Sequence, residues 1–318
     1  MMNRELHIAL VICLASLEGN LIAQDAIVNA ENEKPVKVFL LAGQSNMEGA
    51  GVVPADETKN GGQGSLEYLA RHSGVKEFAD LMRADGSWKE RSDVWIHYLG
   101  RKGKLAPGFG GRADRIGPEL GFGVIVGDYF EEPVLLIKLA WGGKSLAVDF
   151  RPPSAGGDAP GTYYQSLVTE TRQLMENSGT EFPEFEGRRL QLAGIGWHQG
   201  WNDRINQAFN DAYETNLAHL IRDLRRDLNQ PGLPFVIAET GMSGESETHP
   251  RALSLMKAQA AVAQYPEFRE NVRFVGTRGF FRPAEVSPSK QAYHWNSNAE
   301  TYYRIGESMG RAMLDMVR

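Results

Sequence analysis

The stretch VFLLAGQSNMEGAG, which runs from Val38 to Gly51, joins a short apolar run to a polar turn built around a serine. Residues 36–43 have the length and composition of a fully buried strand. The turn then presents Gln-Ser-Asn before glycine returns. Ser45 taken alone is more often a helix cap, since serine is a preferred capping residue. It is also placed as a nucleophile would be, at a strand-to-helix turn with its amide at a helix N-terminus.

Four further apolar runs have the character of buried strands, and helical patterns alternate with them. The strand candidates are 133–143, 189–203, 233–240 and 271–277, with a weaker one at 92–100, and the helix candidates are 117–130, 205–228, 251–265 and 298–317. Asn296 or Ser297 is the expected cap of the last helix. Such alternation is typical of a parallel sheet covered on both faces. The sequence therefore predicts an α/β protein, a three-layer α/β/α sandwich around a central, mostly parallel five-stranded sheet.

The chain divides into a terminal segment and one domain. Residues 1–26 have the layout of a secretory signal peptide with its cleavage region, since Arg4 precedes a short apolar run and small residues follow it. That run is too short to span a bilayer as a helix. We expect a mobile lead-in at 27–35, one domain over 36–318, and a secreted or periplasmic protein. The Gly-rich, weakly periodic segment at about 52–116 is expected to be an insertion that lies over the active face and shapes the substrate site.

Composition and charge exclude several classes of function. A net charge of -6 argues against a protein that binds nucleic acid, which needs a basic face. The only cysteine, Cys13, lies inside the predicted signal peptide, so the mature chain would hold no thiol nucleophile, thiolate metal site or disulfide. The sequence shows no His-x-x-x-His motif, and the glycine runs GGQG and GFGG lack the Lys-Ser/Thr pair of a phosphate loop at the right spacing. We therefore expect no metal and no cofactor.

Three of the predicted strands end in residues that could act together, because the carboxyl ends of strands in an open α/β sheet meet at the ligand site. The ends are GQSNM at 43–47, WGGKSL at 141–146 and GWHQGWND at 196–203. The Ser45 amide, a glycine amide near Gly143 and the Asn202 carboxamide are donors of the kind that stabilise the oxyanion of acyl transfer. Each feature alone also fits a turn or a cap. Their expected position together at one edge of the sheet favours a catalytic site over a set of turns and caps.

These blocks resemble the SGNH (GDSL-like) hydrolases, in the branch of the sialate O-acetylesterases and carbohydrate esterase family 6. GQSNM resembles the nucleophile block, GWND at 200–203 the Gly-x-Asn-Asp block, IKLAWGGKSL at 137–146 the Gly-Gly-Thr-Ser-Leu segment, and HWNSNAETYYRIGESMG at 294–310 the terminal block. The resemblance implies a flavodoxin-like fold and a secreted serine esterase that removes O-acetyl groups from a carbohydrate of the sialate or acetylxylan type. It further implies Ser45 as the nucleophile, His294 as the general base, and Ser45, Gly143 and Asn202 as the oxyanion hole.

A serine needs an adjacent base to become nucleophilic, and two histidines compete for that role. His294 precedes the last helix, whereas His198 lies next to the GWND block; we favour His294. The family usually places an aspartate three residues before this histidine, where this chain has Gln291. An acceptor is still needed to fix the tautomer of the base. The candidates are Asp203, Glu239 and Glu285, or else a backbone carbonyl in a Ser-His dyad.

We expect an acetylated carbohydrate as the partner of this site. The candidate substrate contacts are Gln44, His198, Gln199 and Trp201. Aromatic faces suit sugar rings, although each tryptophan taken alone fits a core position equally well. Arg112 and Arg115 could pair with an acidic sugar or be merely solvated. The missing aspartate leaves one alternative open, a non-catalytic carbohydrate-binding protein on the same scaffold.

Overall fold

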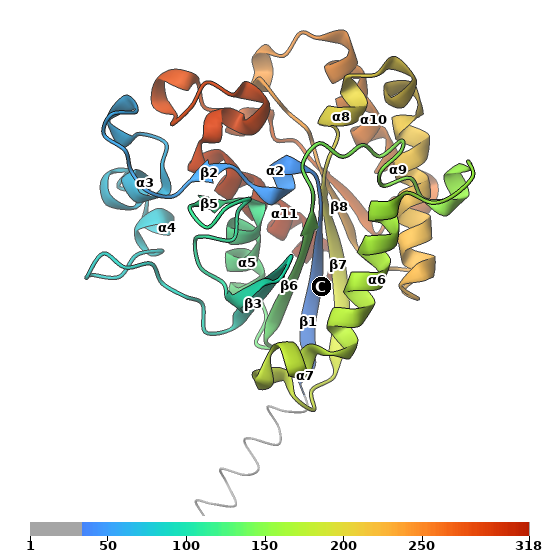
Figure 1. The fold of residues 1–318 in the computed structure, drawn as a ribbon, viewed down its shortest axis with the longest axis horizontal. Coiled ribbons are helices and arrows are strands. Elements are labelled where there is room, and N and C mark those ends of the chain that lie inside the picture. Colours follow the sequence, from blue (N-terminus) through green and yellow to red (C-terminus); the bar gives the residue numbers. More distant parts are fainter. Residues whose placement is uncertain (1–33, 318) are drawn as a thin grey trace, which may run out of the picture.

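A central sheet of seven strands organises the fold, in the order β4-β3-β6-β1-β7-β8-β9 (Figure 1). The structure, a computed structural model, describes residues 34–317. Its strands are β1 (Val36–Gly43), β3 (Val94–Tyr98), β4 (Arg101–Lys104), β6 (Val134–Ala140), β7 (Leu190–His198), β8 (Phe235–Ala238) and β9 (Val272–Val275), while β2 (Gly51–Val52) pairs with β5 (Arg115–Ile116) in a separate sheet. The predicted signal peptide at 1–26 and most of the predicted lead-in at 27–35 lie outside the described residues.

The prediction of a mostly parallel α/β sheet is confirmed, but the predicted count of five strands was wrong. Neighbouring strands of the main sheet are parallel except β3 and β4. The five predicted strands are β1, β6, β7, β8 and β9, which lie in the spatial order 2-1-3-4-5 of flavodoxin-like folds. The weaker candidate at 92–100 is confirmed as β3, whereas β4 was not predicted. Both strands belong to the segment 52–116, so that segment is not an insertion throughout. The sequence of β4, RKGK, gives no apolar alternation because this edge strand is only partly covered.

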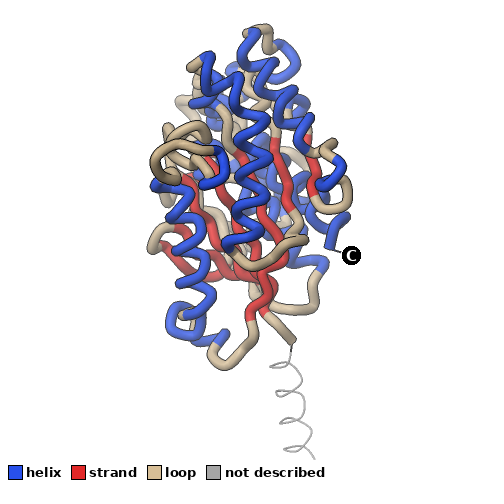
Figure 2. Tube along the Cα trace, turned by 90° about the vertical axis from the view of Figure 1, so that its right-hand side faces the viewer, coloured by secondary structure: helices blue, strands red, loops and turns tan. Residues whose placement is uncertain are grey.

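Helices cover both faces of the main sheet and complete the three predicted layers (Figure 1). The helices are α2 (Ser45–Glu48), α3 (Leu66–His72), α4 (Lys76–Ala79), α5 (Pro118–Tyr129), α6 (Thr162–Glu176), α7 (Ser178–Glu181), α8 (Trp201–Arg204), α9 (Gln207–Asp227), α10 (Pro250–Val262) and α11 (Ala299–Val317). One core lies between the sheet and α6, α9 and α10, and a second lies between the sheet and α5 with α11. Figure 1 shows the strands between these two groups of helices, and Figure 2 shows them from the side, behind the helices of one layer. None of the helices in the described part of the chain combines the length and apolar character needed to cross a membrane.

The cap of α11 differs from the prediction by one or two residues. Asn298 precedes the helix in an extended conformation, and its Oδ1 accepts from the N–H of Thr301 at 3.4 Å. Asn296 and Ser297 have φ values of 52° and 58°, a left-handed backbone that an N-cap residue does not adopt. The sequence pattern alone does not reveal that reversal of the chain.

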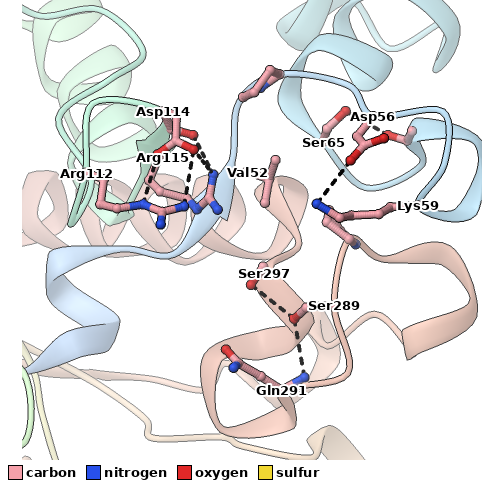
Figure 3. Close-up of a pocket in the computed structure, with 13 residues that line it drawn as sticks. Val52, Asp56, Lys59, Ser65, Arg112, Asp114, Arg115, Ser289, Gln291 and Ser297 are labelled. Atoms are coloured by element: carbon pink, nitrogen blue, oxygen red, sulfur yellow. Dashed lines mark hydrogen bonds and ion pairs between the residues drawn. The ribbon is translucent and has the colours of Figure 1, made fainter.

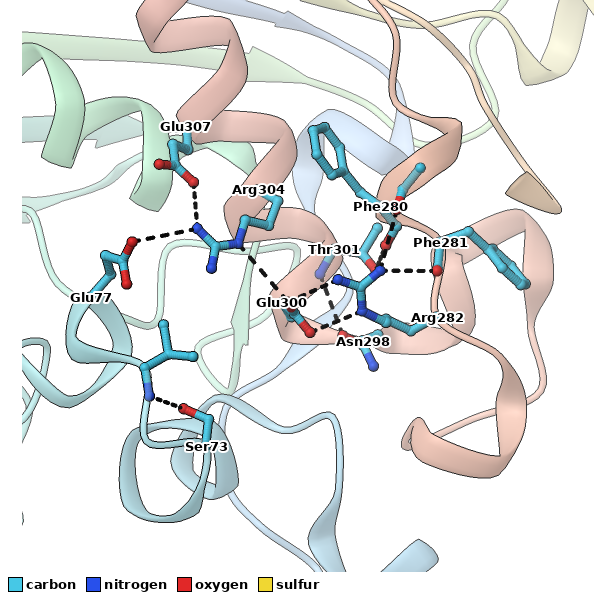
Figure 4. Close-up of polar contacts among 12 residues, drawn as sticks. Ser73, Glu77, Phe280, Phe281, Arg282, Asn298, Glu300, Thr301, Arg304 and Glu307 are labelled. Atoms are coloured by element: carbon cyan, nitrogen blue, oxygen red, sulfur yellow. Dashed lines mark hydrogen bonds and ion pairs between the residues drawn. The ribbon is translucent and has the colours of Figure 1, made fainter. Parts of the chain in front are cut away.

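Polar contacts hold the start of α11 against the segment that precedes it (Figure 4). Arg282 forms an ion pair with Glu300 at 2.9 Å. The hydroxyl of Thr301 donates to the carbonyl oxygen of Phe280 at 2.6 Å. Because the same segment continues to His294, these contacts fix the position of a predicted site residue.

The close crossing of α5 and α11 gives a first prediction, on stability. A Cβ at Gly306 would overlap the carbonyl oxygen of Pro118 in α5. We expect Gly306→Ala to lower the free energy of unfolding by about 1–3 kcal/mol, the usual cost of overpacking a core. Urea denaturation measures this loss. Gly232→Ala is the control, since a Cβ at Gly232 meets no atom within 4 Å; equal stability of the two variants would contradict the packing argument.

Candidate active site

Ser45 is the first residue of α2 and follows the carboxyl end of β1, which lies in the middle of the sheet (Figure 1). Gly43 makes the turn tight, because φ there is +155° and a Cβ would overlap the carbonyl oxygen of the last residue of β7. The amide of Gln44 donates to that carbonyl. The side-chain Oε1 of Gln44 accepts from the N–H groups of Gly200 at 3.0 Å and Asn202 at 3.4 Å. The turns after β1 and β7 are therefore joined into one unit.

His294 and Ser45 lie 249 residues apart in sequence, and Nε2 of the histidine is 3.0 Å from Oγ of the serine. Asn46 secures this contact, since its Nδ2 donates to the carbonyl of Tyr293 and its Oδ1 accepts from the hydroxyl of Tyr302. The ring of His294 is half-buried, and desolvation lowers its pKa. Burial thus favours the neutral imidazole, the form that can accept a proton from a serine hydroxyl.

Asp203, one of the candidate acids, holds the loop after β6 instead of His294. Its carboxylate accepts from the N–H groups of Leu146 at 2.8 Å and Ala147 at 2.9 Å, and from Nε2 of Gln199 at 2.6 Å. Burial raises the pKa of this carboxyl to about 6. Asp203 therefore fixes the loop that carries the paired glycines against the turn after β7.

The other two candidate acids also lie apart from the base. Glu239 accepts from the N–H of Thr277 at 2.9 Å and forms an ion pair with Arg278 at 3.2 Å. Glu285 lies on a short turn at 284–286 and makes no hydrogen bond to His294. In the described part of the chain, no carboxylate accepts a hydrogen bond from Nδ1 of His294.

The three predicted oxyanion-hole residues, Ser45, Gly143 and Asn202, lie on neighbouring turns of the site. The side chain of Asn202 donates to the carbonyl oxygen of Gly143. A Cβ on Gly142 would come to 3.7 Å from Cβ of Ser45, so the paired glycines pass beside the serine. Oε1 of Glu48 accepts from the N–H of Gly142 at 3.1 Å and fixes that turn against α2. The N–H groups of Ser45 and Gly143 donate to no other described residue, which leaves both free for a ligand.

Three of the four predicted substrate contacts are buried, which corrects that prediction. The exposed fractions are 2%, 1% and 1% for Gln44, His198 and Gln199. The two glutamines use their side chains in the turn contacts given above, and desolvation lowers the pKa of His198 to about 4. All three are buried structural residues of the site rather than substrate contacts. Only Trp201 is partly exposed; its ring centroid lies 5.5 Å from that of Tyr293 and 3.8 Å from the guanidinium carbon of Arg204.

A pocket of about 320 Å³ opens beside Ser45 and His294. Glu48 lines it one turn along α2 from the serine, and burial raises the pKa of its carboxyl. The lining also includes Arg112, Arg115 and Gln291. Sequence reasoning missed Glu48, although a spacing of three residues places it on the same helix face as Ser45. The described residues contain no group of three or more histidine, cysteine or carboxylate side chains that could hold a metal ion.

Comparisons with known proteins agree with this architecture. The family model described as carbohydrate esterase, sialic acid-specific acetylesterase, matches residues 35–315. A probable carbohydrate esterase of Arabidopsis thaliana is 26% identical over 208 residues, which are 64% of this chain and 68% of that protein. An X-ray structure of an Arabidopsis thaliana protein has a TM-score of 0.60 at 18% identity, over 89% of this chain and 100% of its own. A carbohydrate acetylesterase from Xanthomonas citri has a TM-score of 0.54 at 14% identity, over 88% of this chain and 56% of its own.

At these identities the two structures show a shared fold, whereas the family match covers most of the chain. The resemblance predicted from the sequence blocks is therefore confirmed. The chain belongs to the carbohydrate esterase family of the sialic acid-specific acetylesterases.

Proposed function

We propose that this carbohydrate esterase is a secreted O-acetylesterase in which Ser45 is the nucleophile and His294 the general base. The observation that carries the proposal is the 3.0 Å contact between Nε2 of His294 and Oγ of Ser45. A serine is activated when an adjacent base can take its proton. An acetylated carbohydrate as substrate is supported by the family description and by the name of the Xanthomonas citri enzyme. Secretion rests on the signal-like layout of residues 1–26.

Acylation would proceed at the mouth of the 320 Å³ pocket. Oγ of Ser45 attacks the acetyl carbonyl carbon while Nε2 of His294 takes the hydroxyl proton. The carbonyl oxygen becomes an oxyanion that accepts from the free N–H groups of Ser45 and Gly143 and from the carboxamide of Asn202. His294 then gives its proton to the sugar oxygen, the C–O bond breaks, and the deacetylated sugar leaves an acetyl-serine.

Deacylation repeats the same steps with water. His294 takes a proton from a water molecule as its oxygen attacks the acetyl-serine carbonyl. The oxyanion again forms among the same donors. Collapse of this second intermediate returns the proton to Oγ of Ser45 and releases acetate. Because no carboxylate among residues 34–317 accepts a hydrogen bond from Nδ1 of His294, we propose that the pair acts as a Ser-His dyad rather than through Asp203, Glu239 or Glu285.

Removal of the Asn202 carboxamide tests its role as an oxyanion donor. We expect Asn202→Ala to lower kcat by about 10²-fold or more, with KM changed much less, because the lost donor acts on charge that develops only in the transition state. Steady-state kinetics on an acetyl ester measures both constants. An unchanged kcat with a raised KM would instead make Asn202 a substrate contact.

Acetate release by the purified mature protein tests the proposed function directly. Wild type and Ser45→Ala are compared on 4-nitrophenyl acetate and on acetylated oligosaccharides. Acetate from the wild type alone supports the esterase. None of the described carboxylates bonds to His294, which favours one other candidate, a non-catalytic carbohydrate-binding protein. That candidate predicts no acetate from either protein, no serine-probe labelling at Ser45, and retained binding to glycans.

A further inference from the structure

The loop after β6 carries the paired glycines, and their own sequence does not fix their conformation. Gly143 has a φ of +70°, in the left-handed region. Glycine adopts positive and negative φ about equally readily, so a pair of glycines can turn an N–H in more than one direction. The N–H of Gly143 is one of the proposed oxyanion donors, and such a donor is effective when it already points to where the charge forms. The turn therefore needs contacts from other elements to hold it.

Two side chains hold the peptide groups on either side of that donor. The N–H of Gly142 donates to Oε1 of Glu48 at 3.1 Å, and the carbonyl oxygen of Gly143 accepts from the side chain of Asn202. The peptide group between the two glycines carries the free N–H of Gly143, and it is flanked by these two held groups. Its orientation is thus set from one side by Glu48 and from the other by Asn202.

Glu48 is itself fixed in place. Ser45 and Glu48 are the first and last residues of α2. The carbonyl oxygen of Glu48 accepts from Nζ of Lys138 at 2.6 Å. Lys138 is fully buried in β6 and forms an ion pair with Glu119 at 2.7 Å. One short helix with a fixed end therefore carries both the nucleophile and the residue that holds the glycine turn.

The carboxylate of Glu48 forms no ion pair with another residue between 34 and 317, although two arginines line the same pocket. Both arginines, Arg112 and Arg115, pair with Asp114 instead, at 3.1 Å and 2.6 Å (Figure 3). Burial raises the pKa of the Glu48 carboxyl, against the smaller opposing effects of its hydrogen bond with Gly142 and of the charge on Lys138. These surroundings disfavour the charge of Glu48, so the property that the glycine turn uses is the oxygen that accepts.

We propose that Glu48 is a positioning residue of the esterase, which holds the turn at 142–143 so that the N–H of Gly143 points to the oxyanion. This inference rests on the proposed function and adds a residue to its machinery. Glu48 acts through the glycine turn rather than on the sugar. Its loss should therefore destabilise the transition state, in which the oxyanion carries charge, and leave substrate binding nearly unchanged.

Three substitutions at Glu48 separate the hydrogen bond from the charge and from packing. Glu48→Ala removes the acceptor, and Glu48→Met removes it while keeping a side chain of similar length. We expect both to lower kcat by about 10- to 100-fold with KM within about threefold of wild type, since the Gly143 donor remains but is less well oriented. Glu48→Gln keeps an oxygen that can accept from the N–H of Gly142, so its kcat should stay within about threefold of wild type.

Glu67→Ala is the matched control, because the carboxylate of Glu67 also accepts from a backbone N–H at 3.1 Å, that of Ala55, and does not line the catalytic pocket. It is expected to keep the wild-type kcat and KM. An unchanged kcat in Glu48→Ala would overturn the inference. A loss in Glu48→Gln as large as in Glu48→Ala would also overturn it, because Glu48 would then act through its charge or as a proton carrier.

Hydrogen exchange separates a failure of this inference from a failure of the esterase proposal. NMR measures the exchange of the Gly142 amide in the free protein, without turnover. We expect this exchange to be about tenfold faster in Glu48→Ala than in wild type and Glu48→Gln, because the amide loses its acceptor. A wild type that releases no acetate would overturn the esterase proposal, whereas equal exchange in all three proteins would overturn the role of Glu48 in an enzyme that still works.

Discussion

Ser45→Ala is expected to abolish acetate release, with kcat reduced on the order of 10⁴-fold or more. Removal of the nucleophile from a serine hydrolase leaves only what the oxyanion donors and substrate binding contribute, and losses of this order are typical. The substitution removes one hydroxyl whose partner is the imidazole of His294. It leaves the turn unchanged, because the contacts that hold the turn come from Gln44 and Asn46. Stability is therefore expected to stay within about 0.5 kcal/mol of wild type.

A second serine–histidine contact in the structure supplies the control for this experiment. Oγ of Ser154 lies 2.6 Å from Nδ1 of His219, but the pair is exposed and neither residue lines the pocket beside Ser45 and His294. Ser154→Ala removes a hydrogen bond of the same kind and is expected to keep wild-type activity. A Ser45→Ala protein that still releases acetate at more than about one per cent of the wild-type rate would exclude Ser45 as the nucleophile.

The sheet could be predicted where burial alone determined the strand. Runs such as VKVFLLAG and PVLLIKLA are apolar on both faces because helices cover both sides of β1 and β6. The edge strand β4 could not be predicted, since a partly exposed strand keeps polar residues on its open side. The cap of α11 was placed too early because the chain reverses through left-handed residues that no local pattern marks.

The candidate site, too, could be predicted from the sequence only in part. The sequence blocks and the family resemblance placed Ser45, Gly143, Asn202 and His294 together. In the structure Ser45 contacts His294, Asn202 contacts Gly143, and Gly142 lies beside Ser45. A polar residue at a strand end has two possible partners, a ligand or the backbone of a neighbouring turn. Gln44 and Gln199 bond to the backbone of neighbouring turns, which only the packed structure could show.

His294→Ala is expected to reduce kcat on the same order as Ser45→Ala, because the serine would lose the base that lies 3.0 Å from its hydroxyl. The double variant is expected to be no worse than either single one, since the two groups act as a unit. His198→Ala is the contrasting variant: that ring is fully buried, and its loss should cost stability rather than leave a folded, inactive protein. Activity retained in His294→Ala would remove His294 from the mechanism.

The pH dependence of the wild type then decides between a dyad and a triad. His294 must be neutral to accept the serine proton, so kcat/KM falls as pH drops through its pKa. Burial lowers that pKa below its ordinary value of 6.5, and in the described part of the chain no carboxylate bonds to Nδ1 to oppose the shift. We therefore expect the acidic limb of the profile to have its midpoint below pH 6.5. The NMR signal of the His294 ring proton, identified by its absence from the spectrum of His294→Ala, should titrate with the same midpoint. A carboxylate partner would stabilise the imidazolium and raise the pKa, so a midpoint above 6.5 would show that a side chain such as Asp203, Glu239 or Glu285 moves to His294 in the working enzyme.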